Sequence, residues 1–444
     1  MKGDNSMQDL LKQIRNEWRS NLWLGVELLV VFCVLWYLVD WGYVTLRTWL
    51  QPMGFDTEHC YNLTFNRLTP QADGYRPDDD ADTDMKNLLA IVERLRHREG
   101  VEYVAVSQNS IPYNDGSNGL TLGVDSTNVT VMQRWVQPDF FPLFRLQGVA
   151  VQTEDGRTVQ TTRPDSLATA MHRRGNHVIL SHNFVSAVRT PSLGYADALS
   201  MLGKDYPYGG YTSDDYLHVA GICEPMRWSH FSTTEQCGGP LAAIELRDSH
   251  ICQLGNPLYV QVSLRLTPDA DTGTRFMDEL MADADRLYTV GNVFLLDVQS
   301  FSSLQETMEM DDVNEVRTQL CVIGFLLLNI FLGVIGTFWF RTQHRRSEIA
   351  LRMSFGSTRR GIFRRLLTEG LLLLTLAAVP AMAIAFNVGM AELVDVERVS
   401  FTGGRFAVAV VGSWVLMALM IIVGIWYPAW RAMRIQPAEA LHDE

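Results

Sequence analysis

Three histidines and two Ser-His pairs are the residues of this 444-residue sequence whose types and spacing suggest metal binding or nucleophilic catalysis. They are His172, His177 and His182, and the dipeptides Ser181-His182 and Ser229-His230. The five-residue spacing of the histidines fits one face of neither a helix nor a strand. The GxSxG elbow that would expose a nucleophilic serine is missing from the sequence. We therefore expect no catalytic residue and no metal site.

The sequence also lacks the Walker A motif for nucleotide binding. The four lysines all lie outside the GxxxxGK[ST] context that cradles phosphate groups. We expect no cofactor, and no enzyme activity from the chain by itself.

An arginine-rich segment, residues 341–369, carries the strongest functional signal. It contains eight arginines and lies between two long apolar runs. The positive-inside bias places such a short basic loop on the cytoplasmic face. Ile349 and Met353 fall on one side of a helix there, and Glu348 and Arg352 form an i,i+4 pair. Such a helix would be presented to a soluble partner; the alternative is a topology anchor on anionic lipid.

Four apolar runs are long enough to cross a bilayer as helices. They are residues 22–43, 319–340, 367–390 and 406–427. The remaining segments are a cytoplasmic amphipathic N-terminus (1–21), a large domain outside the cytoplasm (44–317), the cytoplasmic loop (341–366), a short external loop (391–405) and a cytoplasmic tail (428–444). We therefore expect a four-helix membrane protein with a large α/β (α+β) domain inserted between helices 1 and 2.

The distribution of charge agrees with this orientation. Residues 45–317 contain 37 acidic against 21 basic side chains, whereas the rest of the chain contains 13 against 16. The membrane-flanking segments keep the positive excess, so the acidic middle is predicted to be exported. Nucleic acid is disfavoured as a partner, because the acidic exported domain offers no basic soluble face to neutralise phosphates.

Two features of the spans suggest helix contacts. Ala377, Ala381, Ala385 and Gly389 repeat a small residue every four positions, which lets helices approach closely in lipid. This seam predicts either contacts within one subunit or a dimer interface. Glu27 in the first span is a functional candidate, with an interfacial or helix-paired carboxylate as the favoured alternative.

We predict that the domain between the first two spans is a split βαβ unit with an insertion. A helix capped by Asp84 and running to about residue 98 is followed by strands near 101–107, 120–124 and 129–135. Strands near 258–266 and 294–298 flank a second amphipathic helix. We assign the two halves to residues 55–135 and 258–298 and a second lobe to residues 136–256. A last helix from about residue 303 should run into the second span.

Four cysteines lie in this exported part: Cys60, Cys223, Cys237 and Cys252. They allow three pairings, and the sequence does not choose between one or two disulfides and free buried thiols.

Two motifs resemble the MacB-type ABC transporter permeases with an FtsX-like C-terminal module, the type VII or mechanotransmission class. The loop motif comprises Arg345, Arg346, Glu348, Ile349, Leu351, Arg352, Gly356, Ser357, Glu369 and Gly370. The tail motif comprises Pro428, Ala429, Ala432, Pro437, Glu439, Ala440 and Leu441. A segment with Pro138, Phe140, Phe141 and Gly148 is similar to the MacB-like periplasmic core. The resemblance covers nearly the whole chain, with the FtsX-like module at 319–441.

The resemblance implies a permease subunit in the bacterial inner membrane, with both termini in the cytoplasm and the large domain in the periplasm. A separate ATPase dimer, which would bind the ATP, would dock on the loop motif, with the tail as a second contact. A second permease subunit, identical or paralogous, would complete the transporter. A membrane-fusion protein and an outer-membrane channel are further partners of such assemblies.

Two functions follow from the resemblance. One is export, efflux or lipoprotein release driven by the ATPase through motion of the periplasmic domain. The alternative is an FtsX-like regulator of an envelope hydrolase. The large size of the domain at 44–317 favours transport over regulation. No motif in the sequence indicates the substrate.

Overall fold

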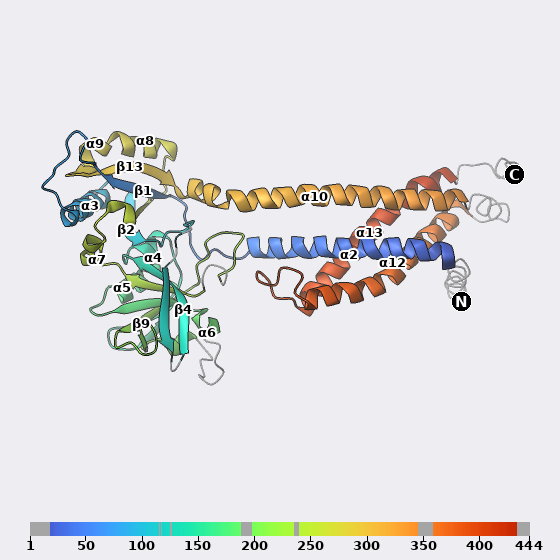
Figure 1. The fold of residues 1–444 in the computed structure, drawn as a ribbon, viewed down its shortest axis with the longest axis horizontal. Helices are drawn as coiled ribbons and strands as arrows, with labels where there is room; N and C mark the ends of the chain where they lie inside the picture. Colours follow the sequence, from blue (N-terminus) through green and yellow to red (C-terminus); the bar gives the residue numbers. More distant parts are fainter. Residues whose placement is uncertain are drawn as a thin grey trace. The chain divides into compact units, whose positions relative to one another are not determined.

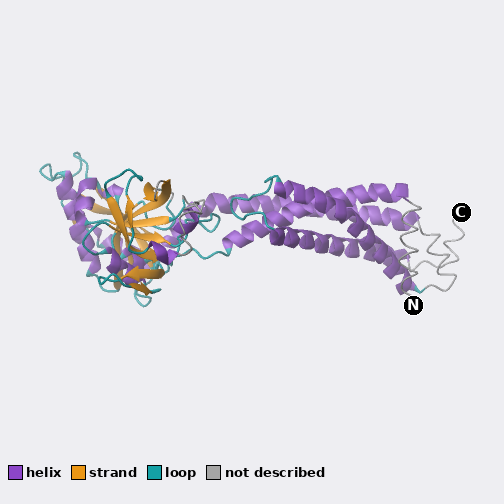
Figure 2. Cartoon of the chain, turned by 90° about the horizontal axis from the view of Figure 1, so that it is seen from below, coloured by secondary structure: helices purple, strands orange, loops and turns teal. Residues whose placement is uncertain are grey.

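The chain divides into two units by its internal contacts. The computed structural model describes residues 18–114, 116, 118–124, 127–187, 198–234, 239–344 and 358–432 (Figure 1). One unit, here called the sheet unit, is Leu50–Asp312; the other, the membrane unit, is Met1–Trp49 with Val313–Glu444. All described strands lie in the sheet unit, as the orange ribbon in Figure 2 shows.

The described part of the membrane unit contains four helices that are long and apolar enough to cross a bilayer. They are α2 (Trp18–Trp49), α10 (Phe301–His344), α12 (Arg359–Met390) and α13 (Gly403–Ala432). The four predicted spans are therefore confirmed. The helices extend beyond the predicted apolar runs, since α2 continues to Trp49 and α10 begins at Phe301, next to the last strand.

The core of the membrane unit lies between α2, α12 and α13. Leu28, Phe32 and Leu35 of α2 are buried against Leu374 and Ala381 of α12, and Ile421 of α13 joins the same cluster. From α10, Val334 is the one fully buried member of this cluster among the described residues. The outer surface of α10 is apolar and exposed, as expected for a helix that faces lipid or a partner.

The first lobe of the sheet unit is a βαββαβ arrangement. Its strands are β1 (Cys60–Arg67), β2 (Val101–Gln108), β11 (Gln261–Leu266), β12 (Thr289–Val290) and β13 (Val293–Ser300). Its helices are α3 (Ala81–Arg96), α8 (Thr274–Ala282) and α9 (Ala284–Leu287). The strand order β13-β1-β11-β2, with antiparallel neighbours, means that each helix connects two parallel strands with another strand between them. This lobe is therefore a split βαβ unit, interrupted between β2 and β11.

The helix α3 forms where the sequence predicts it, but its cap is different. Asp80, and not Asp84, is the N-cap residue, and its carboxylate accepts a hydrogen bond of 2.8 Å from the Thr83 backbone N–H. Asp84 lies inside the first turn with its side chain fully buried, 3.6 Å from Arg67 Nε. The prediction placed the start four residues late because the apolar periodicity begins only at Met85.

The second lobe is a sheet of mixed direction inserted between β2 and β11. Its strands are β3 (Asn118–Val124), β4 (Thr127–Val136), β5 (Gly148–Gln152), β6 (Thr158–Gln160), β7 (His177–Ser181), β8 (Asp205–Pro207), β9 (Tyr216–Cys223) and β10 (Leu241–Glu245). Its helices are α4 (Phe140–Leu143), α5 (Pro164–Met171) and α6 (Phe184–Ala187), and α7 (Asp248–Leu254) follows β10 to pack on α3.

The boundary between the lobes differs from the expected one. β3 and β4 share their core with β7, β9 and β10, so they belong to the second lobe, whereas we expected the first half to extend to residue 135. β2 meets β4 through only two residue pairs, Ser107–Val136 and Gln108–Trp135. The two halves of the sheet therefore diverge from that point.

The described cysteines are all free thiols: Cys33, Cys60, Cys223, Cys252 and Cys321. Cys60, Cys223 and Cys252 are therefore not joined to one another, and Cys237 lies outside the described residues. Burial raises the pKa of the Cys60 and Cys223 thiols to about 12, so both remain protonated members of the core.

Candidate functional site

Most residues of the predicted coupling site lie outside the part of the chain that the structure describes. These are Arg345, Arg346, Glu348, Ile349, Leu351, Arg352, Gly356 and Ser357 of the loop, and Pro437 and Glu439 of the tail. Pro428 falls on the backbone of α13. Their assignment to ATPase coupling stays a prediction.

The described flank of the loop is the first turn of α12. Thr358 caps this helix, because its hydroxyl accepts a hydrogen bond of 3.2 Å from the Gly361 N–H. Arg360 and Arg364 are exposed, whereas Ile362 is buried. This end of α12 thus presents a cationic face to solvent and an apolar face to its own subunit.

The small-residue seam of α12 is packed inside the chain. Ala377, Ala381 and Ala385 are between 0% and 5% exposed. Gly389 faces Phe401, and a Cβ at this glycine would overlap the Phe401 ring. Of the two alternatives for the seam, the structure shows contacts within one subunit; a dimer contact through these residues would require the helices to repack.

Replacing Gly389 with alanine should destabilise the membrane unit by about 1–3 kcal/mol, because the Phe401 ring must move away from Phe386 and Phe406. The midpoint of thermal unfolding in detergent measures this. Gly336→Ala on α10 is the matched control, since a Cβ there meets no atom within 4 Å and the helix gains propensity. Equal midpoints for both variants would contradict the assignment.

A buried ion pair joins α2 to the start of α13. The Arg405 guanidinium donates to both carboxylate oxygens of Asp40, from Nε at 2.8 Å and from Nη2 at 2.5 Å. Its Nη1 donates to the carbonyls of Asp395 (2.8 Å) and Val399 in the connection between α12 and α13. Both charged side chains are at most 2% exposed. One arginine therefore fixes this connection onto α2.

Glu27 is the second charged group of α2 that the sequence singled out. Thr337 Oγ1 of α10 lies 3.2 Å from both of its carboxylate oxygens. The favoured alternative of a helix-paired glutamate is therefore the one observed. This pair is a polar contact between α2 and α10.

A clasp in the sheet unit holds the segment that follows α2 and the beginning of α10. We define the clasp as residues 225–232. Arg227, 1% exposed, donates from Nη1 to the Gln51 carbonyl at 2.6 Å, and its backbone N–H donates to Met53 O at 3.0 Å. Gly54 runs so close to the Pro225 carbonyl that no Cβ would fit there.

Ser229 and His230 of the clasp bind α10. The His230 backbone N–H donates to Glu309 Oε1 at 2.7 Å, and its ring Nδ1 lies 2.9 Å from the same oxygen. Gln305 donates to Glu309 Oε2 at 2.9 Å. Burial alone would raise the pKa of Glu309, but these hydrogen bonds outweigh it and lower the pKa. Ser229-His230 thus binds the acidic side of α10, where Ser229 Oγ lies 3.5 Å from Asp312.

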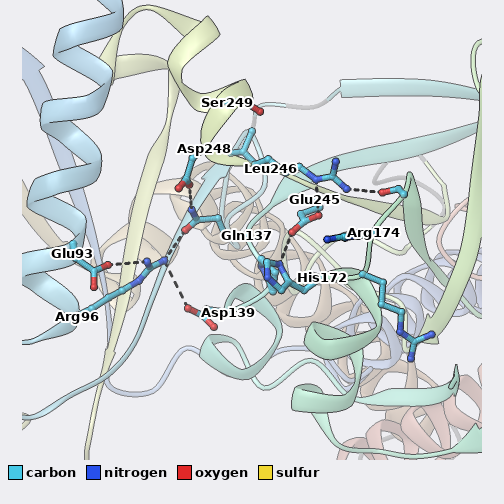
Figure 3. Close-up of a pocket in the computed structure, with 14 residues that line it drawn as sticks. Glu93, Arg96, Gln137, Asp139, His172, Arg174, Glu245, Leu246, Asp248 and Ser249 are labelled. Atoms are coloured by element: carbon cyan, nitrogen blue, oxygen red, sulfur yellow. Dashed lines mark hydrogen bonds and ion pairs between the residues drawn. The ribbon is translucent and has the colours of Figure 1, made fainter. Parts of the chain in front are cut away.

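A cleft of about 1040 Å³ lies where the two lobes diverge (Figure 3). It is bordered by α3, by the residues after β4 and β10, and by residues 172–175 after α5. Gln137 joins the lobes here, since its side-chain oxygen accepts from Val106 N–H and from Arg96, and its Nε2 donates to Asp248.

The three histidines considered for metal binding have separate partners. His172 Nδ1 lies 2.8 Å from Glu245, His177 Nε2 lies 3.1 Å from the Arg174 carbonyl, and His182 Nδ1 lies 3.0 Å from Glu224. No group of three or more metal-binding side chains occurs among the described residues. Arg405 and Arg227 were not predicted from the sequence, because Asp40 and Gln51, to which they donate, are distant from them in the chain.

Comparison with known families identifies the membrane unit. Residues 320–437 match the family model "FtsX-like permease C-terminal", which covers α10 from its membrane portion through α12 and α13. This part of the chain matches the FtsX-like permease family. The match agrees closely with the module expected at 319–441 and contains the arginine-rich loop.

Curated relatives connect the chain to MacB-type exporters. It is 24% identical over 276 residues to the macrolide export ATP-binding/permease protein MacB of Syntrophobacter fumaroxidans, covering 62% of this chain and 35% of that protein. It is 26% identical over 147 residues to the pyoverdine export ATP-binding/permease protein PvdT of Pseudomonas fluorescens, covering 33% of this chain and 21% of PvdT. The chain therefore spans about a third or less of the length of these relatives. The resemblance to MacB-type and FtsX-like permeases is confirmed.

Among solved structures, the periplasmic region of MacB from Actinobacillus actinomycetemcomitans overlaps the chain with 11% sequence identity and a TM-score of 0.32, covering 59% of this chain and 97% of that one.

Proposed function

We propose that this FtsX-like permease transmits the energy of ATP hydrolysis, supplied by a separate ATPase, to its sheet unit on the periplasmic side of the membrane. The observation that carries the proposal is the match of the FtsX-like domain to residues 320–437, which includes the arginine-rich loop between α10 and α12. In this proposal the ATPase docks on the loop from the cytoplasm, and the tail forms a second contact.

The continuity of α10 supports a mechanical relay. This helix has 44 residues, which corresponds to a rod of about 66 Å. Its described part reaches His344, inside the arginine-rich segment, so a displacement caused by ATP-driven closure would act on this end of the helix. An unbroken helix passes such a displacement along its axis with little loss, since its backbone hydrogen bonds resist bending.

The first turns of α10 are anchored in the core of the sheet unit. Phe301 is fully buried, with its ring 5.1 Å from that of Phe144, and Leu304 and Met308 pack against the same cluster. Glu309 is held by the clasp. A movement of α10 would therefore move the second lobe with it. Export of a substrate already outside the inner membrane fits this arrangement, because the described spans carry few charges for an aqueous path.

Charge reversal at Glu348 tests the docking step. With the full chain co-expressed with its ATPase, Glu348→Arg should abolish co-purification of the ATPase, because it reverses an acidic charge in an otherwise basic segment. The matched control is Glu397→Arg in the exposed connection between α12 and α13, which should leave co-purification intact. Retention of the ATPase by Glu348→Arg would refute coupling through this loop.

The same variants separate export from regulation of an envelope hydrolase. If the protein is an exporter, Glu348→Arg should stop ATP-dependent release of substrate from cells without changing peptidoglycan cleavage. The reverse pattern would assign the regulatory function instead.

A further inference from the structure

The cleft between the lobes lies at the carboxyl ends of a parallel strand pair. β4 and β10 run parallel, with Val136 opposite Glu245, so the residues that follow both strands meet at one edge of the sheet. In sheets with parallel strands, ligands bind in the crevice outside these ends, where the connections leave in different directions. Here one connection leads to α4 in the second lobe and the other to α7, which packs on the first lobe.

The acidic groups of the cleft are already paired. Figure 3 shows Arg96 joined to Glu93, at 3.2 Å, and to Asp139, at 3.8 Å. Glu245 is held by His172 at 2.8 Å and by Arg247 at 2.9 Å. The remaining acid is Asp248, which accepts a hydrogen bond of 3.3 Å from Gln137.

Two cations in the cleft have no such partner. Arg173 and Arg174 make no side-chain hydrogen bond or ion pair with any residue that the structure describes, and in Figure 3 no dashed line reaches Arg174. The Nε of Arg173 is shielded from solvent and still unbonded within the described ranges. Arg174 is exposed, and the Nη1 and Nη2 atoms of Arg173 are not among the buried unbonded atoms, so these guanidinium nitrogens can donate to an acceptor that is supplied from outside.

The same two arginines also border a second opening. A cleft of about 870 Å³, lined by α5 and by the β5–β6 turn, has Arg173, Arg174, His177 and His218 in its wall and Glu154 as its acid. Burial lowers the pKa of the His177 imidazole, and the nearby charges of Arg173 and Arg247 add to that effect. Arg173 and Arg174 thus place two positive charges in the wall that the two clefts share.

We propose that Arg173 and Arg174 bind a small solute with at least two carboxylate or phosphate groups in the cleft between the two lobes. Arginine suits such groups because its planar fork donates two parallel hydrogen bonds to a carboxylate or phosphate. A solute that bridges both walls would also hold the lobes together, since Arg96 and Asp248 lie on the opposite side from Arg174 (Figure 3). This site is independent of ATPase docking, so either proposal stands if the other fails.

Titration calorimetry on the full chain in lipid nanodiscs tests the site, with citrate as the carboxylate probe and inorganic pyrophosphate as the phosphate probe. We expect saturable binding of one probe or both; the preferred probe identifies the group. Arg173→Ala and Arg174→Ala should each weaken that binding by about tenfold or more, the effect of one charge-assisted contact. Lysine at both positions should restore part of the affinity, because the charge remains and the fork is lost.

The matched control is Arg275→Ala, which removes an exposed arginine of the first lobe that is paired with Glu279 on its own helix. This variant should bind the probes as the unaltered chain does. All variants should keep the thermal unfolding midpoint of the unaltered chain, which shows that the sheet unit is folded. Absence of saturable binding to the unaltered chain, or unchanged binding in the Arg173→Ala/Arg174→Ala double variant, would overturn the proposal.

Discussion

Replacing Arg405 with alanine should destabilise the membrane unit by about 3–5 kcal/mol, the cost of leaving one member of a buried ion pair without its partner. Asp40, 2% exposed, would lose both hydrogen bonds to its carboxylate. The carbonyls of Asp395 and Val399 would lose their donor as well. The expected result is a sharp fall in the thermal unfolding midpoint and a loss of monodisperse protein on extraction into mild detergent.

Arg398→Ala is the matched control for this prediction. Arg398 lies in the same connection and pairs with Asp395 at 2.9 Å, but both side chains are partly exposed, at 25% and 31%. Solvent screening limits such a pair to less than about 1 kcal/mol. Arg405→Lys should fall between the two alanine variants, because it keeps the charge and loses the fork. If Arg398→Ala and Arg405→Ala lowered the thermal unfolding midpoint equally, the Arg405–Asp40 ion pair would not be the contact that fixes α13 to α2.

The membrane helices were the part of the fold most accessible to sequence analysis. Runs of about 20 apolar residues have few alternatives to a spanning helix, and basic loops fix their direction. What could not be predicted was the identity of the polar contacts between helices. Asp40 and Arg405 are separated by 365 positions, and nothing in the local sequence of either indicates the other.

The elements of the first lobe that the sequence predicted are amphipathic ones. α3 shows a helical stripe of Leu88, Ile91, Val92 and Leu95, and β11 shows a clear strand pattern. The strand β10 was missed. Its sequence, LAAIE, is buried on both faces and therefore lacks the alternation that reveals a strand with one solvated face.

The candidate cleft could not be derived from sequence for a different reason. Its charged residues come from four separate segments, between α3 and α7, which the chain brings together only through the order of the strands. In the sequence, residues 172–174 stand out only because His172 is spaced five residues from His177, and this spacing suggests a metal site rather than an anion site. Whether an arginine is paired or unpaired is a property of the folded surface, so Arg96 and Arg174 look alike in the sequence.

Arg227→Met should weaken the clasp and destabilise the sheet unit by about 3 kcal/mol or more. The guanidinium donates to the carbonyls of Gln51 (2.6 Å), His230 (2.8 Å) and Ser232 (2.9 Å), and methionine fills similar volume without any donor. Each buried carbonyl left without a donor costs about 1–3 kcal/mol. Hydrogen–deuterium exchange should rise both in residues 50–56 and in the clasp.

Arg145→Met provides the matched control, since Arg145 pairs with Asp56 in the same stretch at 2.9 Å but is 51% exposed. Arg145→Met should leave hydrogen–deuterium exchange unchanged both in residues 50–56 and in the clasp. Under the proposed relay, Arg227→Met has a further consequence. The clasp links the segment after α2 to Glu309 on α10, so its loss should let α10 move without carrying that segment.

A substitution at Glu309 can separate the effect of the clasp on stability from its effect on the transmission of motion from α10. Glu309→Gln keeps the shape of the side chain and its acceptor oxygen for the His230 N–H, but removes the charge that faces the His230 ring. We expect a loss of stability smaller than that of Arg227→Met. If the relay runs through this contact, ATP-driven export should nevertheless fall in both variants, while ATPase co-purification stays normal. Normal export in Arg227→Met, at a temperature where the protein is still folded, would show that α10 acts on the sheet unit through Phe301 and its core contacts alone.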